Sequence, residues 1–330
     1  MSLGIVSSYD EKLLEVARNV LRTNLGVSPG EKLLVITDTE KIGIGMALFR
    51  AGLDLGLDAV ISIMRPRRRN GEEPPDHVAA SWLESEVFIA PTRYSLTHTQ
   101  ARRRAVERGS RGATMPNINE DIFIRTLSID YRNHVAPLCR RILDMISRCS
   151  EIRVETEMGT KISFQVGGRE FHIDSGIYDK PGSWGNLPAG EVYIAPVEGT
   201  AEGIVIVDGS ISGGIGVVKN PVKITVRNGF AIDIAGHSEA SELRGVLDSV
   251  GRREAYNFPA EFGIGCNPSA RLSGVVLEDE KILGTVHMAF GDNSTFGGAT
   301  MAGVHIDVVI LRPTIYVDGR IVANKGVWRS

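Results

Sequence analysis

Two histidines and an aspartate stand within apolar, strand-like segments in the last quarter of this sequence. His287 lies inside TVHMAF, and His305 and Asp307 alternate with apolar residues in VHIDVVI. Residues two apart in a strand point to the same face, so His305 and Asp307 are predicted to share one. A buried charge needs a partner or a bound cation. The pattern therefore indicates a metal site, with a hydrogen-bonded core histidine as the simpler alternative.

Two glutamates at the starts of predicted strands extend this candidate site. Glu191 opens EVYIAP directly after the turn-like NLPAG, and Glu261 opens EFGIG after NFPA. Each glutamate alone is equally compatible with a solvated strand end. Carboxylate oxygens combined with imidazole nitrogens suit Zn²⁺, Mn²⁺, Co²⁺ or Fe²⁺. The five candidate metal ligands are Glu191, Glu261, His287, His305 and Asp307.

The first 150 residues are predicted to form an α/β domain. Apolar runs predict strands at residues 32–38, 58–64, 86–91 and 113–116, and helical patterns fill residues 10–25, 42–56, 74–85 and 98–109. Strands that alternate with helices imply a parallel sheet with crossover connections. Two further helices are predicted at residues 119–128 and 131–148. Near residue 150 the sequence changes from alternating strands and helices to mainly strands.

Residues 151–330 are predicted to form a strand-rich α+β domain that carries the metal site. Glycine becomes frequent there, and one helix is expected, at residues 238–250. The loop GDNSTFGGATMAG, residues 291–303, is rich in glycine and poor in anchoring side chains. Such a loop is mobile unless something covers it. We therefore expect a homodimer, the commonest closed assembly, whose interface lies on this domain and partly encloses the metal cleft.

Composition limits the kinds of partner. A net charge of −3 gives no reason to expect nucleic acid or an anionic membrane surface. No apolar run approaches the ~20 residues that span a bilayer, and no secretory leader is evident at the N-terminus. The three cysteines show no CxxC spacing and are expected to be reduced, which suits the cytoplasm. The expected substrate is a small molecule, and a small peptide is what the family resemblance described next implies.

Several segments together resemble the aminopeptidase T family of metallopeptidases. They are NLPAGEVYIAP, EFGIGCNP, LGTVHMAFGDN and HIDVVI, and residues 95–118 are similar to the family's N-terminal domain. The resemblance covers most of the chain, and the motifs follow the family's order. It implies an α/β domain plus a strand-rich metal-binding domain, a pair of divalent metals such as Zn, Mn or Co, and a dimer. It also implies that the five candidate ligands named above hold these metals.

The resemblance implies an aminopeptidase-like hydrolase that cleaves N-terminal residues from peptides. Two metals would lower the pKa of a bound water, and Glu261 or Glu191 would serve as general base. One departure stands against this. The peptidases carry a tyrosine shortly after the position of His287, whereas this sequence continues MAFGDNSTFGG. Tyr193, Tyr178 or Tyr256 would have to replace it in space.

A second resemblance leads to a different enzyme class. The family's fold is similar to that of a non-haem iron dioxygenase that cleaves dihydroxypyridine rings. His287, His305 and Asp307 would then form a facial triad for Fe(II), with both glutamates outside it. His98 would act as an acid or base, although a surface histidine at a helix start explains it equally. A non-catalytic metal-binding homologue is the third alternative. Two zinc or manganese ions per chain would favour hydrolysis, and one iron would favour oxygenation.

Overall fold

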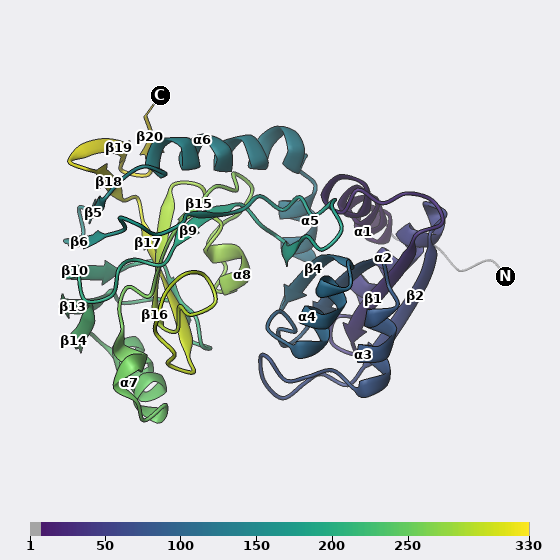
Figure 1. The fold of residues 1–330 in the computed structure, drawn as a ribbon, viewed down its shortest axis with the longest axis horizontal. Helices are drawn as coiled ribbons and strands as arrows, with labels where there is room; N and C mark the ends of the chain where they lie inside the picture. Colours follow the sequence, from purple (N-terminus) through teal and green to yellow (C-terminus); the bar gives the residue numbers. More distant parts are fainter. Residues whose placement is uncertain (1–7, 330) are drawn as a thin grey trace. The chain divides into compact units, whose positions relative to one another are not determined.

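The computed structural model describes residues 8–329 and divides the chain into two compact units, which Figure 1 draws in sequence colours. Met1–Pro137 and Asp174–Ala189 form the first unit, and Leu138–Ile173 and Gly190–Ser330 form the second. This division differs from the single boundary expected near residue 150. The chain leaves the first unit earlier and later returns to it, because a strand near residue 185 completes the first sheet.

The first unit is the predicted α/β domain with a parallel sheet, and the sheet order is β2-β1-β3-β4-β8. Each of the first four strands is followed by a helix that leads to the next element. The strands are β1 (Lys32–Asp38), β2 (Asp58–Met64), β3 (Val87–Thr92), β4 (Arg111–Pro116) and β8 (Trp184–Asn186), and the helices are α1 (Ser8–Asn19), α2 (Ile42–Asp54), α3 (Asp76–Leu83), α4 (Gln100–Glu107) and α5 (Glu120–Leu127).

Alternate residues of the buried strand β1 face two helical layers. Leu34 packs in one apolar cluster with Trp82 of α3 and Ala105 of α4. Leu33 lies on the opposite face, against Gly52 of α2. A strand covered on both faces is apolar at consecutive positions, which explains the uninterrupted run KLLVITD. The three-layer arrangement follows from this alternation.

The second unit is the predicted strand-rich domain, built from two mainly antiparallel sheets. One sheet has the order β14-β13-β10-β6-β5-β18-β19-β20, and the other has the order β12-β11-β17-β16-β15-β9-β7. The first contains β5 (Glu151–Glu155), β6 (Lys161–Gln165), β10 (Glu202–Val207), β13 (Val222–Arg227), β14 (Phe230–Ala235), β18 (Thr314–Val317), β19 (Arg320–Asn324) and β20 (Val327–Trp328). The second contains β7 (His172–Asp174), β9 (Glu191–Ile194), β11 (Ser210–Ile211), β12 (Gly216–Val217), β15 (Glu261–Gly265), β16 (Thr285–Gly291) and β17 (His305–Leu311).

Three helices accompany these sheets, α6 (Ala136–Ile146), α7 (Ser238–Ser249) and α8 (Val276–Asp279). Strand β15 shows how the two sheets form a core. Phe262 packs its ring 5.2 Å from that of Phe164 on β6, measured between centroids. Because side chains alternate, Glu261, Gly263 and Gly265 point to the other face of the seven-stranded sheet. Over residues 8–329, no helix is long and apolar enough to cross a membrane.

Candidate metal centre

Four neighbouring strands bring the five predicted ligands to one face of the seven-stranded sheet. Gly265 of β15 is paired with Glu191 of β9, and Ala289 of β16 lies between Glu261 of β15 and Asp307 of β17. Residues paired across antiparallel strands point to the same side. His287 and His305 each stand two residues from one of these positions and therefore share that side. The cluster thus follows from strand register.

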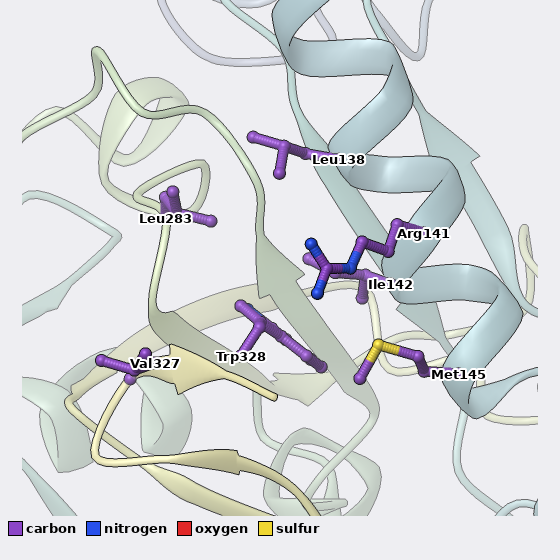
Figure 2. Close-up of a pocket in the computed structure, with 8 residues that line it drawn as sticks. Leu138, Arg141, Ile142, Met145, Leu283, Val327 and Trp328 are labelled. Atoms are coloured by element: carbon purple, nitrogen blue, oxygen red, sulfur yellow. The ribbon is translucent and has the colours of Figure 1, made fainter. Parts of the chain in front are cut away.

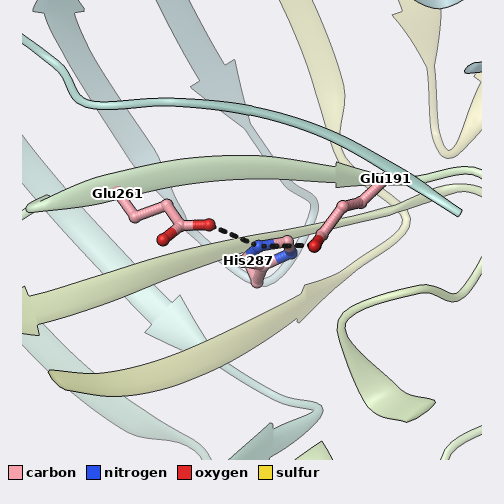
Figure 3. A group of neighbouring side chains, drawn as sticks. All are labelled: Glu191, Glu261 and His287. Atoms are coloured by element: carbon pink, nitrogen blue, oxygen red, sulfur yellow. Dashed lines mark hydrogen bonds and ion pairs between the residues drawn. The ribbon is translucent and has the colours of Figure 1, made fainter. Parts of the chain in front are cut away.

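Glu261 lies between the two histidines and directs one carboxylate oxygen to each. Its Oε1 is 3.3 Å from Nε2 of His287, and its Oε2 is 3.3 Å from Nε2 of His305. On the far side of His287, Nε2 lies 3.4 Å from Oε2 of Glu191, as Figure 3 shows. Nε2 of His305 is 3.1 Å from Oδ1 of Asp307. All five side chains therefore form one continuous chain of contacts.

The donors converge in two groups that share Glu261. One group contains Glu191, Glu261 and His287, and the other contains Glu261, His305 and Asp307; within each, the ligand atoms lie within 4.8 Å of one another. The expected facial triad of His287, His305 and Asp307 draws on both groups and stays a prediction. Glu261 is shared because β15 lies beside β16 and its glutamate reaches between the imidazoles. The donor set fits a divalent cation.

Glycine on β15 makes room for this arrangement. A Cβ at Gly263 would lie 2.0 Å from the imidazole Nε2 of His287, so the ring lies directly over this glycine. Only a residue without a side chain permits that approach. Gly265, two residues later, likewise allows the main chain of Ile282 to approach closely. A Cβ at Gly265 would lie 2.1 Å from the carbonyl oxygen of Ile282. The motif EFGIG therefore supplies one ligand and two positions of close approach.

The two histidines differ in what holds their second ring nitrogen. Nδ1 of His305 donates to the backbone carbonyl oxygen of Asp292 at 2.8 Å, which leaves Nε2 as the nitrogen that faces the carboxylates. Histidines that bind metals almost always donate their other N–H in this way. Nδ1 of His287 is buried without a hydrogen-bond partner among the described residues. His305 therefore has the support typical of a metal ligand, and His287 lacks it.

Burial and ion pairing together shift the pKa values of the cluster. Burial alone would raise the pKa of Glu261, but hydrogen bonds from His287 and His305 outweigh it and hold that pKa well below its usual range. Burial opposes protonation of His287, yet Glu261 and Glu191 raise its pKa to about 9. Asp307 and Glu261 likewise raise the pKa of His305 well above its ordinary value, against the effect of burial. Without metal, both imidazoles are charged near neutral pH.

A buried lysine that the sequence analysis did not single out also belongs to the centre. Lys281 is 1% exposed, and its Nζ lies 2.7 Å from Oε1 of Glu191. Oε2 of Glu191, in contrast, accepts no hydrogen bond from the described residues. Lys281 lies outside every predicted strand, so no local pattern pointed to it.

The glycine-rich loop beside the centre is anchored, contrary to expectation. Asp292 accepts hydrogen bonds from the backbone of Ser294 and Ala302, and Glu198 accepts from the backbone of Ala299 and from the side chain of Asn293. Most of these contacts are local, but Glu198 comes from a distant part of the sequence. These contacts tie the loop to the second unit, and its cover by a second subunit stays a prediction. Its apolar Met301 is nevertheless 70% exposed.

The centre opens to solvent at His305, whose side chain is 33% exposed while the other four ligands are buried. Aromatic rings border this opening. The ring of Phe296 stands edge-on to His305 at 6.0 Å, and that of Tyr193 lies 5.7 Å from Phe296. His172 follows, 5.3 Å from Tyr193. Tyr193 is paired with Gly263 across the strands and so shares the face of the ligands.

His98 lies in the first unit, exposed, just before Thr99, the N-cap of α4. Its expected acid or base role, and any role of Tyr178 from the same unit, stay predictions. Tyr256, in the second unit, donates to Asp248 at 2.6 Å. Of the three tyrosines considered as replacements for the missing family tyrosine, Tyr193 lies on the ligand face.

A separate pocket of about 310 Å³ in the second unit is lined by none of the candidate metal ligands. As Figure 2 shows, helix α6 supplies Leu138, Ile142 and Met145 to one wall, and Val327 and Trp328 lie opposite. The lining is mainly apolar, with Arg141 as its charged member. The candidate site is therefore the polar cluster and not this pocket.

A family profile and a curated relative indicate the same family. The profile of the NicX family, 2,5-dihydroxypyridine 5,6-dioxygenase, matches residues 12–329. A curated relative of that name from Pseudomonas putida is 24% identical over 207 residues, which span 57% of this chain and 57% of that protein. The match thus covers just over half of the relative's length.

Two solved structures share the fold. The 2,5-dihydroxypyridine dioxygenase of Pseudomonas putida KT2440 gives a TM-score of 0.82 at 17% identity, over 97% of this chain and 98% of that one. AmpT from Thermus thermophilus gives a TM-score of 0.69 at 17% identity, over 98% and 100%. The resemblance to aminopeptidase T therefore holds for the fold. The predicted function, a metallo-aminopeptidase and thus a hydrolase, is wrong, since the family profile and the curated relative both indicate a dioxygenase.

Gly263→Ala is expected to disturb the centre without unfolding the domain. The added Cβ would lie 2.0 Å from the imidazole of His287, which is buried and must move. We expect Mn²⁺ affinity to fall at least about tenfold, in the range seen when the support of a ligand is lost. Gly245→Ala in α7 is the control, because nothing lies within 4 Å of its Cβ. Isothermal titration that finds equal affinity for Gly263→Ala and wild type would contradict this account of β15.

Metal binding is expected to release protons. His305 carries a proton in the metal-free protein near neutral pH, because Asp307 and Glu261 raise its pKa, whereas a metal binds neutral imidazole. Apparent Mn²⁺ affinity should therefore rise from pH 6.5 towards 9. The raised pKa of His287 stabilises the metal-free fold fully below about pH 6.5, the unfolded value, and this contribution is lost as pH passes about 9. Titration heats that do not differ between phosphate and Tris buffers would show that no proton is released.

Proposed function

This chain belongs to the 2,5-dihydroxypyridine 5,6-dioxygenase family, and on that premise we propose that it is a ring-cleaving dioxygenase dependent on Fe(II). The match of the family profile to residues 12–329 is the observation that carries the proposal. The substrate class is a small hydroxylated nitrogen heteroaromatic, by analogy with the curated relative's name. The products would contain both atoms of O₂, and one carbon–carbon bond of the ring would be broken.

The group with the better-supported histidine is the one assigned to the metal. Glu261, His305 and Asp307, one histidine and two carboxylates, would hold the ion, which would supply the redox chemistry that oxygenation requires. The Asp292 carbonyl keeps Nε2 of His305 directed at this position. His287 lies outside this group, and its Nε2 contacts Oε1 of Glu261.

The aromatic border supports a planar substrate. Phe296 and Tyr193 stand beside the one ligand that is open to solvent, and His172 extends the row. Ring centroids 4.5–7 Å apart are the spacing at which aromatic groups attract one another. A substrate ring that entered here would meet these side chains and the metal position together. His98 remains a candidate acid or base from the first unit.

Oxygen consumption tests the proposed reaction directly. Protein loaded anaerobically with Fe(II) should consume one O₂ per molecule of 2,5-dihydroxypyridine, and ¹⁸O₂ should label the product with two oxygen atoms. Asp307→Asn and His305→Ala should lower kcat at least about 100-fold, because losing a ligand exceeds the 10–100-fold effect of losing its outer support. Asp233→Asn and His237→Ala, both exposed in the same unit, are the matched controls.

Two outcomes would contradict the proposal. One is oxygen uptake no faster than with free Fe(II) across a panel of hydroxylated pyridines and phenols. The other is release of 4-nitroaniline from amino-acid anilides by protein loaded with Zn²⁺, Mn²⁺ or Co²⁺.

We also propose a homodimer whose interface covers the glycine-rich loop, residues 291–303. The exposed Met301 on that loop and the edge strand β12, with Val217 at 42% exposure, are apolar surface that a second copy would bury. The three free, buried cysteines suit a reducing compartment, so we expect the cytoplasm. Light scattering at micromolar concentration should give about twice the chain mass, and a mass near 35.8 kDa would contradict the dimer.

A further inference from the structure

His98 is the exposed residue of a short segment, residues 96–99, whose other side chains are buried. The segment lies between β3 and α4. Leu96 packs in the apolar core of the first unit. The hydroxyl of Thr99 donates to the carbonyl oxygen of Leu96 at 2.7 Å and so closes a tight turn around His98. The first unit thus presents one histidine on a backbone that is tied down on either side.

Polar side chains from neighbouring strands hold Thr97, the residue before His98. Its Oγ1 lies 2.7 Å from Oγ1 of Thr114 on β4 and 3.2 Å from Oδ1 of Asn186 on β8. Strand β8 belongs to the segment that returns to the first unit, and it is parallel to β4. Residues far apart in the sequence therefore support this side of the loop.

Hydrogen bonds to the loop between β2 and α3 hold both ends of the same segment. The backbone N–H of Ser95 donates to Oδ1 of Asn70 at 2.9 Å, and its carbonyl oxygen accepts from the N–H of Gly71 at 2.8 Å. The carboxylate of Glu73 accepts from the N–H of Gln100, at the start of α4, at 2.6 Å. The backbone of the segment is therefore held from before its first residue to after its last.

Arg102 of α4 adds a charged group to this support. It is 5% exposed, and its Nε donates to the carbonyl oxygen of Thr97 at 2.8 Å. The guanidinium carbon lies 3.5 Å from the ring centroid of Trp184 on β8. An aromatic face attracts a guanidinium and holds its plane. Both contacts compensate a charge that would otherwise be costly to bury.

The carbonyl group that Arg102 binds belongs to the peptide group that joins Thr97 to His98. A peptide group is planar, so a hydrogen bond to its oxygen also orients the N–H and the Cα of the next residue. The direction of that Cα determines where the imidazole of His98 lies. The place of a buried guanidinium is thereby linked to the orientation of an exposed histidine.

We propose that Arg102, stacked on Trp184, is a positioning residue for His98. Its hydrogen bond holds the Thr97–His98 peptide plane, and the indole holds the guanidinium. The inference rests on the proposed function, in which His98 is the candidate acid or base, but it concerns the orientation of that histidine and not the class of reaction. Proton transfer needs such a group within hydrogen-bond reach, and a displacement of about 1 Å lowers a rate by up to about 10²-fold.

A double-mutant cycle separates positioning from general structural support. Oxygen consumption by the Fe(II)-loaded protein with 2,5-dihydroxypyridine gives kcat and KM for Arg102→Met, His98→Ala and the double variant. Arg102→Met should lower kcat at least about tenfold and leave KM within about twofold. In the His98→Ala background the same substitution should lower kcat by less than about twofold, because the effects of residues that act as a unit do not add.

Backbone hydrogen exchange tests the same contact without any reaction. Amides of residues 96–99 should exchange faster in Arg102→Met than in wild type, because the loop loses a buried hydrogen bond. Arg104→Met is the matched control, since Arg104 is exposed on the same helix. It should change neither kcat nor the exchange rate.

Three results would overturn the inference. One is a fall in kcat of equal size when Arg102→Met is made with and without His98. The others are an unchanged kcat in His98→Ala and an unchanged exchange rate in Arg102→Met. Should Arg102→Met fail to fold, Trp184→Leu, at an exposed position, decides by the same measurements. A wild-type protein that consumes no oxygen refutes the dioxygenase instead, and the exchange measurement then decides the contact by itself.

Discussion

The buried carboxylate of Glu261, held between two imidazoles, is the interaction on which the rest of the centre depends. Its two oxygens each lie 3.3 Å from a histidine Nε2. Removing one partner of a buried ion pair typically destabilises a protein by about 3–5 kcal/mol, since the remaining charge is uncompensated. The carboxylate therefore needs compensating positive charge. Two protonated imidazoles supply it, or a bound metal ion that replaces an imidazole proton. This exchange couples metal binding, protonation and stability in one small region.

The sheet accommodates that carboxylate through its small residues. Strand β15 places Glu261, Gly263 and Gly265 on one face and Phe262 and Ile264 on the other. The apolar face packs in the core between the sheets, with Phe262 against Phe164. The glycine face receives the imidazole of His287 and the main chain of Ile282. Strand β15 thus packs in the core through one face and leaves room for the metal ligands on the other. The five-residue motif EFGIG therefore supplies both core packing and part of the site.

What could be predicted from the sequence was local. The pair His305 and Asp307 follows from the alternation of a strand, whereas each glutamate alone is also compatible with a solvated strand end. The α/β and strand-rich halves follow from periodicity, and the structure confirms this fold class. The central position of Glu261 depends on register among β9, β15, β16 and β17, which no single segment encodes.

The features that were missed come from contacts between distant segments. Glu198 anchors a loop about a hundred residues away, and β8 completes a sheet whose other strands end before residue 117. Lys281 reaches Glu191 only because Gly265 lets the chain pass close by. Loop composition alone therefore does not reveal the hydrogen bonds that a side chain from elsewhere supplies.

The same difference between local motifs and contacts from distant segments explains why the predicted enzyme class was wrong. Motifs such as EFGIG and HIDVVI encode a face of a sheet that presents oxygen and nitrogen donors, and two proteins with different names share this fold at TM-scores of 0.82 and 0.69. A donor set does not determine how many cations it holds, because that depends on the surrounding charge. Here a buried ammonium within 2.7 Å of Glu191 is part of that charge, and it comes from a segment outside every motif. A shared scaffold and donor set therefore do not by themselves determine the reaction.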